Sequence, residues 1–415
     1  MSERRDPDEV ARELRARLAG LKRRRRFVPW GESRRLADEL DELLYDIDTS
    51  VADPCSGAEY TAAFYESDNA ILGNCDDSSG YVGDVYRLHA REVFVGFAVK
   101  CADKKWLGDL VLKLNRRDDY GVRDALVNCA AEYLPEPEIR LMIARLRDLA
   151  DSESGRSGAK RWLHLVETLA RQLGDAPLFE KTRRASWGRL PTAACVDIAE
   201  VYLEAGDAVT ALSWLERIPV DESFQQDERD ALLLRVHGEL GDPSRQAEVA
   251  WRMFRRARSG ASLQRLVAML GEGRRAEVVA TEVRAILDDP ALSYVDMGFL
   301  IEMEQFDAAE AYLLDRADRI DGDYYDWLLP VADAMAVTAH PLAASVVYRA
   351  LIESILEKAR SKIYHYAVRY LKKLDLLSPQ VSDWKSIPDH AAYLECLRAK
   401  HGRKTSFWSR YGRAR

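Results

Sequence analysis

Basic and aromatic side chains alternate near the C-terminus, and no other pattern in the sequence has a clearer chemical use. Cationic heads beside aromatic rings can bind phosphate and stack on bases, as in single-stranded nucleic-acid sites. They equally suit a packed seam or a protein contact, in which Lys and Arg stems lie on apolar surface and their heads reach water. The candidate partner-binding residues are Arg360, Lys362, His365, Arg369, Arg403, Lys404 and Trp408.

A second basic run, Lys22–Arg26, lies near the other end of the chain. It could contact phosphates or act as a nuclear import signal. It could also be the solvated end of a helix, where cations complement the helix dipole. Residues 1–26 carry a net charge of +5 and residues 340–415 one of +9, whereas residues 27–339 carry −22. The ends should therefore dock on the acidic body, in the same chain or a second copy, or attract an acidic partner or polyanion.

Common catalytic and metal-binding motifs are missing. The sequence contains no G-x-x-x-x-G-K-[ST], H-E-x-x-H, G-x-S-x-G or C-x-x-C. Residues 271–276 match G-x-G-x-x-A, but the preceding LQRLVAML has helical periodicity, so we expect a turn between helices there. Residues 76–84 lack the alternating acidic ligands and closing Glu of a calcium loop. We expect no cofactor, no metal and no catalytic residues, with an enzyme assembled from distant residues as the least favoured alternative.

Helical hairpins are the elements that must position these side chains. The turns are expected at Gly206, Gly241, Gly273, Gln305 and His340, separated by 35, 32, 32 and 35 residues. A period near 34 is typical of tetratricopeptide-like helix pairs. Small residues after each turn should let the second helix approach its neighbours closely; these are Ala208, Ala211, Ala247, Ala250, Ala276, Ala280, Ala308, Ala309, Ala311, Ala343 and Ala344. The pattern predicts an all-α, tetratricopeptide-like α-solenoid whose core comes from stacking.

The flanking segments should be helical but less regular. We expect four parts: a basic N-terminal helical arm (1–26), an irregular helical N-terminal region (27–150), helical repeats (159–345) and a basic C-terminal helical cap (346–415). Helices are predicted at 7–25, 33–47, 82–100, 104–114, 120–133 and 137–151. Asp84 and Asp119 are the expected N-caps, because their carboxylates can accept from free amides of a first turn. A helix break is expected at 360–362, and the tail should end as a basic aromatic strip.

The compartment is expected to be the cytoplasm. The first thirty residues lack an apolar signal-peptide core, and no apolar run is long enough to cross a membrane. The six cysteines are scattered, so we expect reduced thiols. They are Cys55, Cys75, Cys101, Cys129, Cys195 and Cys396.

Several stretches resemble an uncharacterised bacterial family of all-helical, repeat-like proteins. The C-terminal signature comprises residues 348–377, the pair Asp383-Trp384 and residues 397–408, and two further motifs lie at 76–87 and 118–127. Similar regions occur beside SWIM-type zinc fingers. The resemblance implies an α-solenoid-like protein of unknown role. This chain lacks the C-x-C and C-x-H pairs of a SWIM finger, so zinc and SWIM-linked DNA binding are not implied.

These observations favour a non-catalytic scaffold or adaptor that binds a protein partner through the solenoid surface and the C-terminal cap, since stacked helix pairs offer an extended binding surface. The alternative is a nucleic-acid-associated factor that uses the two basic ends. Self-association is also compatible with the charge pattern.

Overall fold

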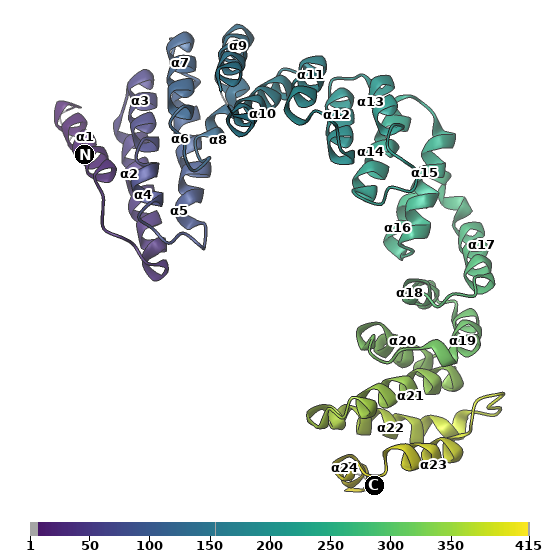
Figure 1. Ribbon diagram of the computed structural model, residues 1–415. Coiled ribbons are helices and arrows are strands. Elements are labelled where there is room, and N and C mark those ends of the chain that lie inside the picture. Colours follow the sequence, from purple (N-terminus) through teal and green to yellow (C-terminus); the bar gives the residue numbers. More distant parts are fainter. Residues whose placement is uncertain (1–6, 154, 414–415) are drawn as a thin grey trace, which may run out of the picture. The chain divides into compact units, whose positions relative to one another are not determined.

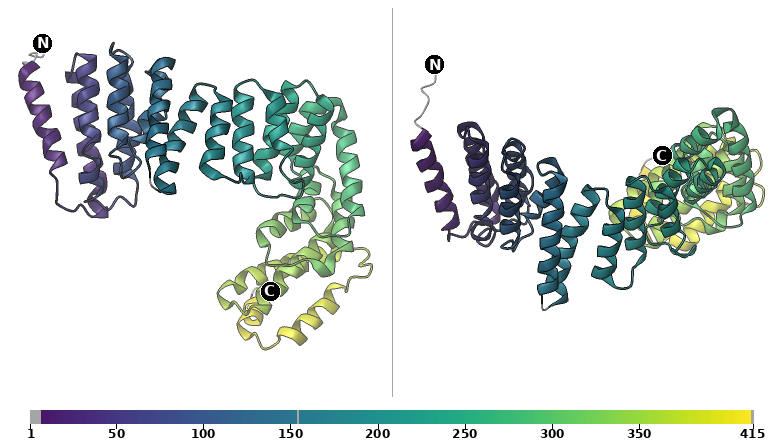
Figure 2. Two further views of the ribbon diagram at one scale, coloured as in Figure 1. Left: turned by 45° about the horizontal axis from the view of Figure 1, so that its top comes forward. Right: turned by 90° about the horizontal axis from the view of Figure 1, so that it is seen from above.

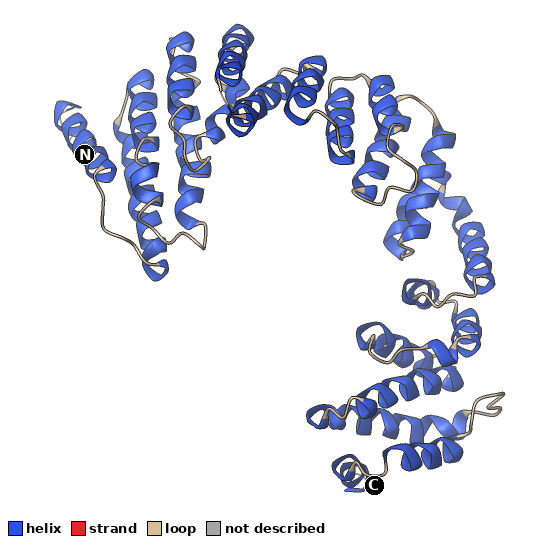
Figure 3. Cartoon of the chain, in the orientation of Figure 1, coloured by secondary structure: helices blue, strands red, loops and turns tan. Residues whose placement is uncertain are grey.

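The computed structural model describes residues 7–153 and 155–413, and these are organised by helices (Figures 1 and 3). Among them, extended pairing is limited to an isolated bridge between Val28 and Cys75. The predicted all-α class is thus confirmed. The chain forms two compact units, Met1–Leu240 and Gly241–Arg415. Their boundary falls inside the predicted 159–345 array, and the four predicted segments stay predictions.

The first part of the first unit is a set of helices of uneven length. Helix α1 packs on α2, α3 and α4, α3 packs on α6, and α7 packs on α9; these helices follow one another in both views of Figure 2. The helices are α1 (Pro7–Lys22), α2 (Ser33–Ser50), α3 (Pro54–Tyr65), α4 (Asp68–Leu72), α5 (Tyr81–Asp84), α6 (Ala90–Ala98), α7 (Lys104–Asn115), α8 (Asp124–Val127) and α9 (Glu136–Ser152).

Two sequence expectations fail in this part. Helices α3 and α4 were not predicted, and the helix expected at 120–133 is only the four-residue α8. Gly57 explains why α3 is hard to recognise: a Cβ there would lie 2.3 Å from a ring carbon of Phe97. A position that looks like a helix breaker therefore allows α3 to approach α6 closely.

The aspartates expected to cap helices are also misassigned. Asp84 lies inside α5, and Asp77 instead accepts hydrogen bonds from the amides of Val82 (2.9 Å) and Gly83 (2.7 Å). Asp118, not Asp119, accepts from the amides of Tyr120, Gly121 and Arg123. Both motifs therefore use an aspartate to organise their own loops.

The remainder of the first unit is a succession of helices, each packed on the next. These are α10 (Arg156–Gln172), α11 (Ala176–Trp187), α12 (Thr192–Glu204), α13 (Ala208–Leu215) and α14 (Gln226–Glu239). The turn at Gly206 has φ +82° and is followed by Asp207, whose carboxylate accepts from Thr210 N. Gly174 (φ +65°) and Asp175 form the same turn between α10 and α11. The turn at Gly174 lies inside the predicted repeat segment but was not among the predicted turns, and the Gly-Asp dipeptide shared with Gly206-Asp207 was its signal.

The second unit continues with paired helices. Its helices are α15 (Pro243–Arg256), α16 (Gly260–Leu270), α17 (Arg275–Asp288), α18 (Tyr294–Glu302), α19 (Phe306–Asp315), α20 (Tyr325–Val337), α21 (Pro341–Glu357), α22 (Tyr364–Leu377), α23 (His390–His401) and α24 (Thr405–Arg413). Gln305 and His340 begin α19 and α21 as predicted. Helix α18 packs on α19 and α20, and α21 packs on α19, α20 and α22.

One detail of the repeat prediction is corrected here. The turn expected at Gly273 is present as the 3-10 turn Glu272–Arg274, and the glycine with a positive φ, +100°, is Gly271 just before it. Ala343 and Ala344 are buried as expected, whereas Ala276 and Ala280 are exposed on α17. Small residues after a turn therefore do not always mark the packed face.

The cysteines are not all reduced. Cys55 at the start of α3 forms a disulfide with Cys101 just after α6, which corrects the expectation of six free thiols. Cys75, Cys129, Cys195 and Cys396 are free. Across residues 7–153 and 155–413, each helix is too short or too polar to cross a membrane.

Candidate partner-binding surface

The first group of predicted residues lies where α21 gives way to α22. Helix α21 ends at Glu357, a 3-10 turn covers Ser361–Ile363, and α22 begins at Tyr364, so the predicted break is confirmed. Helix α22 buries one apolar face in the second unit. The polar edge left outside carries Arg360, Lys362, His365 and Arg369, all exposed.

An exposed tyrosine organises this group. The guanidinium of Arg369 lies 5.1 Å from the ring centroid of Tyr366, and the His365 ring centroid lies 4.1 Å from the same ring. Tyr366 is 40% exposed. Cation–π contacts of this kind hold a cationic head over a ring while leaving both accessible. We define Arg360, Lys362, His365, Tyr366 and Arg369 as the α22 patch.

The second group lies at the turn between α23 and α24. The tail is helical, and Phe407 is buried edge-on against Tyr364 of α22, with ring centroids 6.1 Å apart. Arg403 is exposed, whereas Lys404 and Trp408 are half-buried. The burial follows from amphipathic spacing: Phe407 and Tyr411 are four residues apart and both face the core.

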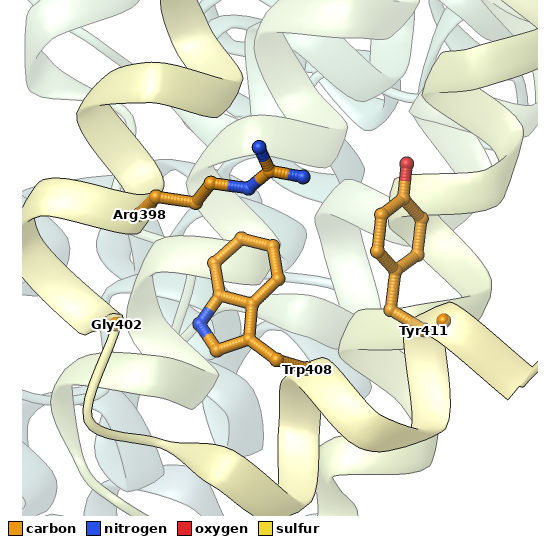
Figure 4. Close-up of a pocket in the computed structure, with 5 residues that line it drawn as sticks. Arg398, Gly402, Trp408 and Tyr411 are labelled. Carbon is orange, nitrogen blue, oxygen red and sulfur yellow. The ribbon is translucent and has the colours of Figure 1, made fainter.

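Trp408 lines a cavity of about 430 Å³ with Arg398, Gly402, Tyr411 and Gly412 (Figure 4). The guanidinium of Arg398 lies 5.5 Å from the Trp408 ring centroid, and Trp408 Nε1 donates to the carbonyl of His401 (3.0 Å). Arg398 and Tyr411 were not predicted. Tyr411 lies three residues after Trp408 on α24, whereas Arg398 lies on α23 and is brought to Trp408 by the α23–α24 turn.

The structure therefore places the seven predicted residues in two neighbouring groups and not in one constellation. Helices α22 and α24 pack on each other. The first group gathers around Tyr366, whereas Trp408 faces Arg398 and Tyr411. Each group combines cationic side chains with an aromatic ring that is at least partly exposed.

The two basic ends of the chain differ in how far their cationic side chains form ion pairs. In the N-terminal arm, Arg17 pairs with Asp46, Lys22 with Glu66, and Arg24 with Glu39 at 3.5 Å. That arm is thus docked on acidic helices of its own unit, as one of the charge hypotheses expected.

The C-terminal cap keeps positive charge that is not paired in this way. Lys358 pairs with Asp323 and lowers the pKa of that carboxyl, and Lys400 does the same for Glu357. Within the part of the chain that the structure describes, no ion pair is formed by the five predicted cationic residues: Arg360, Lys362, Arg369, Arg403 and Lys404. Arg360 and Arg369 act on carboxylates at longer range, since they help to lower the pKa of Asp323 and of Asp333.

Acidic and basic side chains also meet in the first unit. Asp124 and His164 line a cavity of about 330 Å³ with Arg87, Arg91 and Asn128. Burial raises the pKa of Asp124, and Glu167, 3.9 Å from the imidazole Nδ1, raises the pKa of His164. The lining residues include no Ser, Thr, Cys or Lys that could act as a nucleophile. Over the described ranges, no cluster of three His, Cys, Asp or Glu could hold a metal ion.

Sequence comparison identifies a family but no activity. The model of a family described as "Family of unknown function (DUF6880)" matches residues 1–186 and 156–410. A search of the curated proteins finds no match.

Proposed function

Since the chain belongs to the DUF6880 family, whose description names no activity, we propose a role from its own surfaces: a non-catalytic scaffold or adaptor that binds a protein partner. Binding uses the surface of the paired helices and the basic C-terminal cap. The observation that carries the proposal is the set of five unpaired cationic residues of the cap beside exposed aromatic rings. Interfaces commonly anchor on aromatic and Arg side chains of this kind.

The partner is expected to present an acidic segment with an apolar or aromatic anchor. Acidic side chains would meet Arg360, Lys362 and Arg369, while the anchor would pack on Tyr366 or enter the Trp408 cavity. Charge complementarity accelerates encounter and selects the partner, and the buried anchor supplies most of the affinity.

The paired helices are tetratricopeptide-like in this proposal. Turns at Gly174, Gly206, Gly241, Gly273, Gln305 and His340 recur at about the expected interval. The packing of α18 on α20 and of α19 on α21 supports this assignment, because first helices contact first helices and second helices contact second helices. The protein is proposed to work in a bacterial cytoplasm. Cell fractionation of the native host tests this location.

The test is affinity capture of the tagged full chain from its host, with and without nuclease, followed by mass spectrometry. We expect a stoichiometric protein partner that survives nuclease and is lost from the triple variant Arg360→Glu, Lys362→Glu, Arg369→Glu. The loss should be at least about tenfold, since charge reversal adds repulsion to the lost attraction.

A matched control reverses three exposed arginines on other helices: Arg147, Arg265 and Arg284. This variant should retain the partner. Equal loss from both variants would point to non-specific electrostatics. Loss on nuclease treatment, together with a steep fall in binding as salt rises, would instead favour the nucleic-acid alternative.

A further inference from the structure

A buried arginine in the second unit lacks the partners that its charge requires. Arg349 lies on α21 in the otherwise apolar run VVYRALI and is 8% exposed. Its guanidinium lies 4.9 Å from the ring centroid of Trp384 and 4.5 Å from that of Tyr393. Burial lowers the pKa of Arg349, because the desolvated charge forms no ion pair within the described part of the chain.

The unsatisfied donors occupy one edge of the guanidinium. Arg349 Nη1 donates to the carbonyl of Pro388 (2.7 Å), whereas Nε and Nη2 are buried without a partner. The N–H bonds of Nε and Nη2 point the same way and form the fork that binds a carboxylate through two parallel hydrogen bonds. The hydroxyl of Tyr393, 8% exposed, is also buried without a partner. Burial raises the pKa of Tyr393, which keeps this hydroxyl a donor.

Two other buried arginines show what the same group does when it is satisfied. In the first unit, Arg123 uses this edge to hold Asp68, with Nε–Oδ2 at 2.7 Å and Nη2–Oδ1 at 2.6 Å. In the second unit, Arg316 directs its guanidinium at backbone carbonyls, including Ala291 and Tyr312. Leaving a buried charged donor unpaired is costly, so the open edge of Arg349 calls for a ligand.

Arg349 and Tyr393 both line a cavity of about 430 Å³ between α21, the loop before α23, and the segment after α19. This volume lies in the range of small-molecule sites. Asp321, Glu353 and Glu357 also line the cavity, and Lys400 pairs with both glutamates, 3.1 Å from the Glu353 carboxylate. Acidic residues in this cavity disfavour a phosphate dianion and leave a monoanion as the better match for the fork.

We propose that this cavity binds a carboxylate group, held side-on by Nε and Nη2 of Arg349 with the Tyr393 hydroxyl as a third donor. The carboxylate comes from a small organic acid or from the C-terminus of a peptide. The cavity is lined by a different set of residues from the α22 patch and the Trp408 cavity, so this inference does not depend on the adaptor proposal.

The test measures binding of defined probes to the full chain by calorimetry and thermal shift. The probes are acetate and benzoate for small acids, N-acetyl-Ala-Leu with a free carboxylate for a peptide end, its amide, and inorganic phosphate. We expect saturable binding of at least one carboxylate, and at least about tenfold weaker binding of the amide and of phosphate. Benzoate binding alone identifies a small acid, and binding of the dipeptide acid alone identifies a peptide end.

Variants assign the binding to Arg349. Arg349→Lys keeps the charge but loses the fork, and Arg349→Met loses both, so each should weaken binding at least about tenfold. Tyr393→Phe removes one hydroxyl and should weaken binding about three- to tenfold, which keeps the test valid if the arginine variants do not fold. Arg265→Met, at an exposed position on α16 away from the cavity, serves as the control and should bind like the wild type. Failure of every carboxylate to bind at 50 mM, or unchanged binding by Arg349→Met, would overturn the proposal.

Discussion

At the residue scale, the chain contains both a buried and an exposed Arg–Asp ion pair. The pair formed by Arg123 and Asp68 has side chains 3% and 0% exposed, and its two oxygens each meet one guanidinium nitrogen. The surface pair of Arg17 and Asp46 is made of the same residue types but is 36% and 45% exposed. The two pairs should therefore contribute very differently to stability, because water screens only the second.

Removing the charge of Asp68 should be severe. We expect Asp68→Asn to lower the free energy of unfolding by about 3–5 kcal/mol, since it leaves Arg123 charged and buried without a counterion. The matched change Asp46→Asn should cost less than about 1 kcal/mol. Urea unfolding of the full chain, followed by far-UV circular dichroism, measures both. Equal effects would mean that the buried pair contributes no more than a surface contact.

Thiol chemistry gives a second prediction at this scale. Under denaturing, non-reducing conditions, iodoacetamide should modify four cysteines, and after reduction it should modify six, because Cys55 and Cys101 are joined. Intact mass spectrometry counts the adducts. Six adducts before reduction would restore the sequence-based expectation of free thiols throughout, which suits a reducing compartment better.

His164 makes stability depend on pH. Glu167 raises the pKa of His164 above 6.5, so the folded state favours the protonated imidazole. This contribution is complete below about pH 6.5 and is lost as the pH rises through the higher folded-state pKa. Wild type should therefore exceed His164→Gln in melting temperature at pH 6 by more than at pH 8.5. A difference that does not change with pH would show that the imidazole contributes only packing.

At the scale of the element, the turns show which features the sequence period of about 34 residues predicts and which it does not. Recurrent turn residues correctly marked the starts of α13, α19 and α21. They could not show which glycine in LGEGR takes the left-handed conformation, because Gly271 and Gly273 differ in sequence context by only two positions. The structure assigns it to Gly271, directly after the last hydrogen-bonded turn of α16.

Substitution by alanine should affect the stability of the protein differently at Gly206 and at Gly273. Gly206→Ala should cost about 1–2 kcal/mol, because φ is +82° there although a Cβ would meet nothing within 4 Å. Gly273→Ala should be neutral or slightly stabilising, since its φ is not in the left-handed region and the site is equally open. Thermal and urea unfolding of both variants provide the measurement. A similar loss at both sites would contradict the assignment of strain to backbone conformation alone.

At the scale of the whole molecule, the chain is organised as two units with separate internal contacts. The first contains a continuous apolar core from Leu14 to Leu169, and a second cluster extends from Ala170 to Val236. Because both clusters lie within the first unit, that unit should not need the second one to fold.

A truncated chain tests this independence. We expect residues 1–240 alone to be helical by circular dichroism and to unfold cooperatively, since both of their apolar clusters lie within the fragment. The comparison is a fragment that ends at residue 215, before α14: it removes the buried Ile218 and α14, exposes the face of α13 that packs on α14, and should lower the melting temperature. A fragment 1–240 that lacks a cooperative transition would show that the second unit is required.

The sequence by itself determined the helical class, several turns within the helix pairs, the break after α21 and the two basic ends of the chain. These follow from local periodicity and from residue types, which are readable along the chain. Helix α3 was missed because Gly57 is required by close contact with Phe97 of α6, and such a contact leaves no local pattern.

Only the tertiary structure decided which charges are neutralised. It pairs the N-terminal cations with Asp46, Glu66 and Glu39, joins Cys55 to Cys101, and brings Arg398 to Trp408. It also leaves Arg349 with an open edge, although its sequence environment differs little from that of any arginine on an amphipathic helix. Burial and pairing depend on distances across the fold, so residues far apart in sequence settle them.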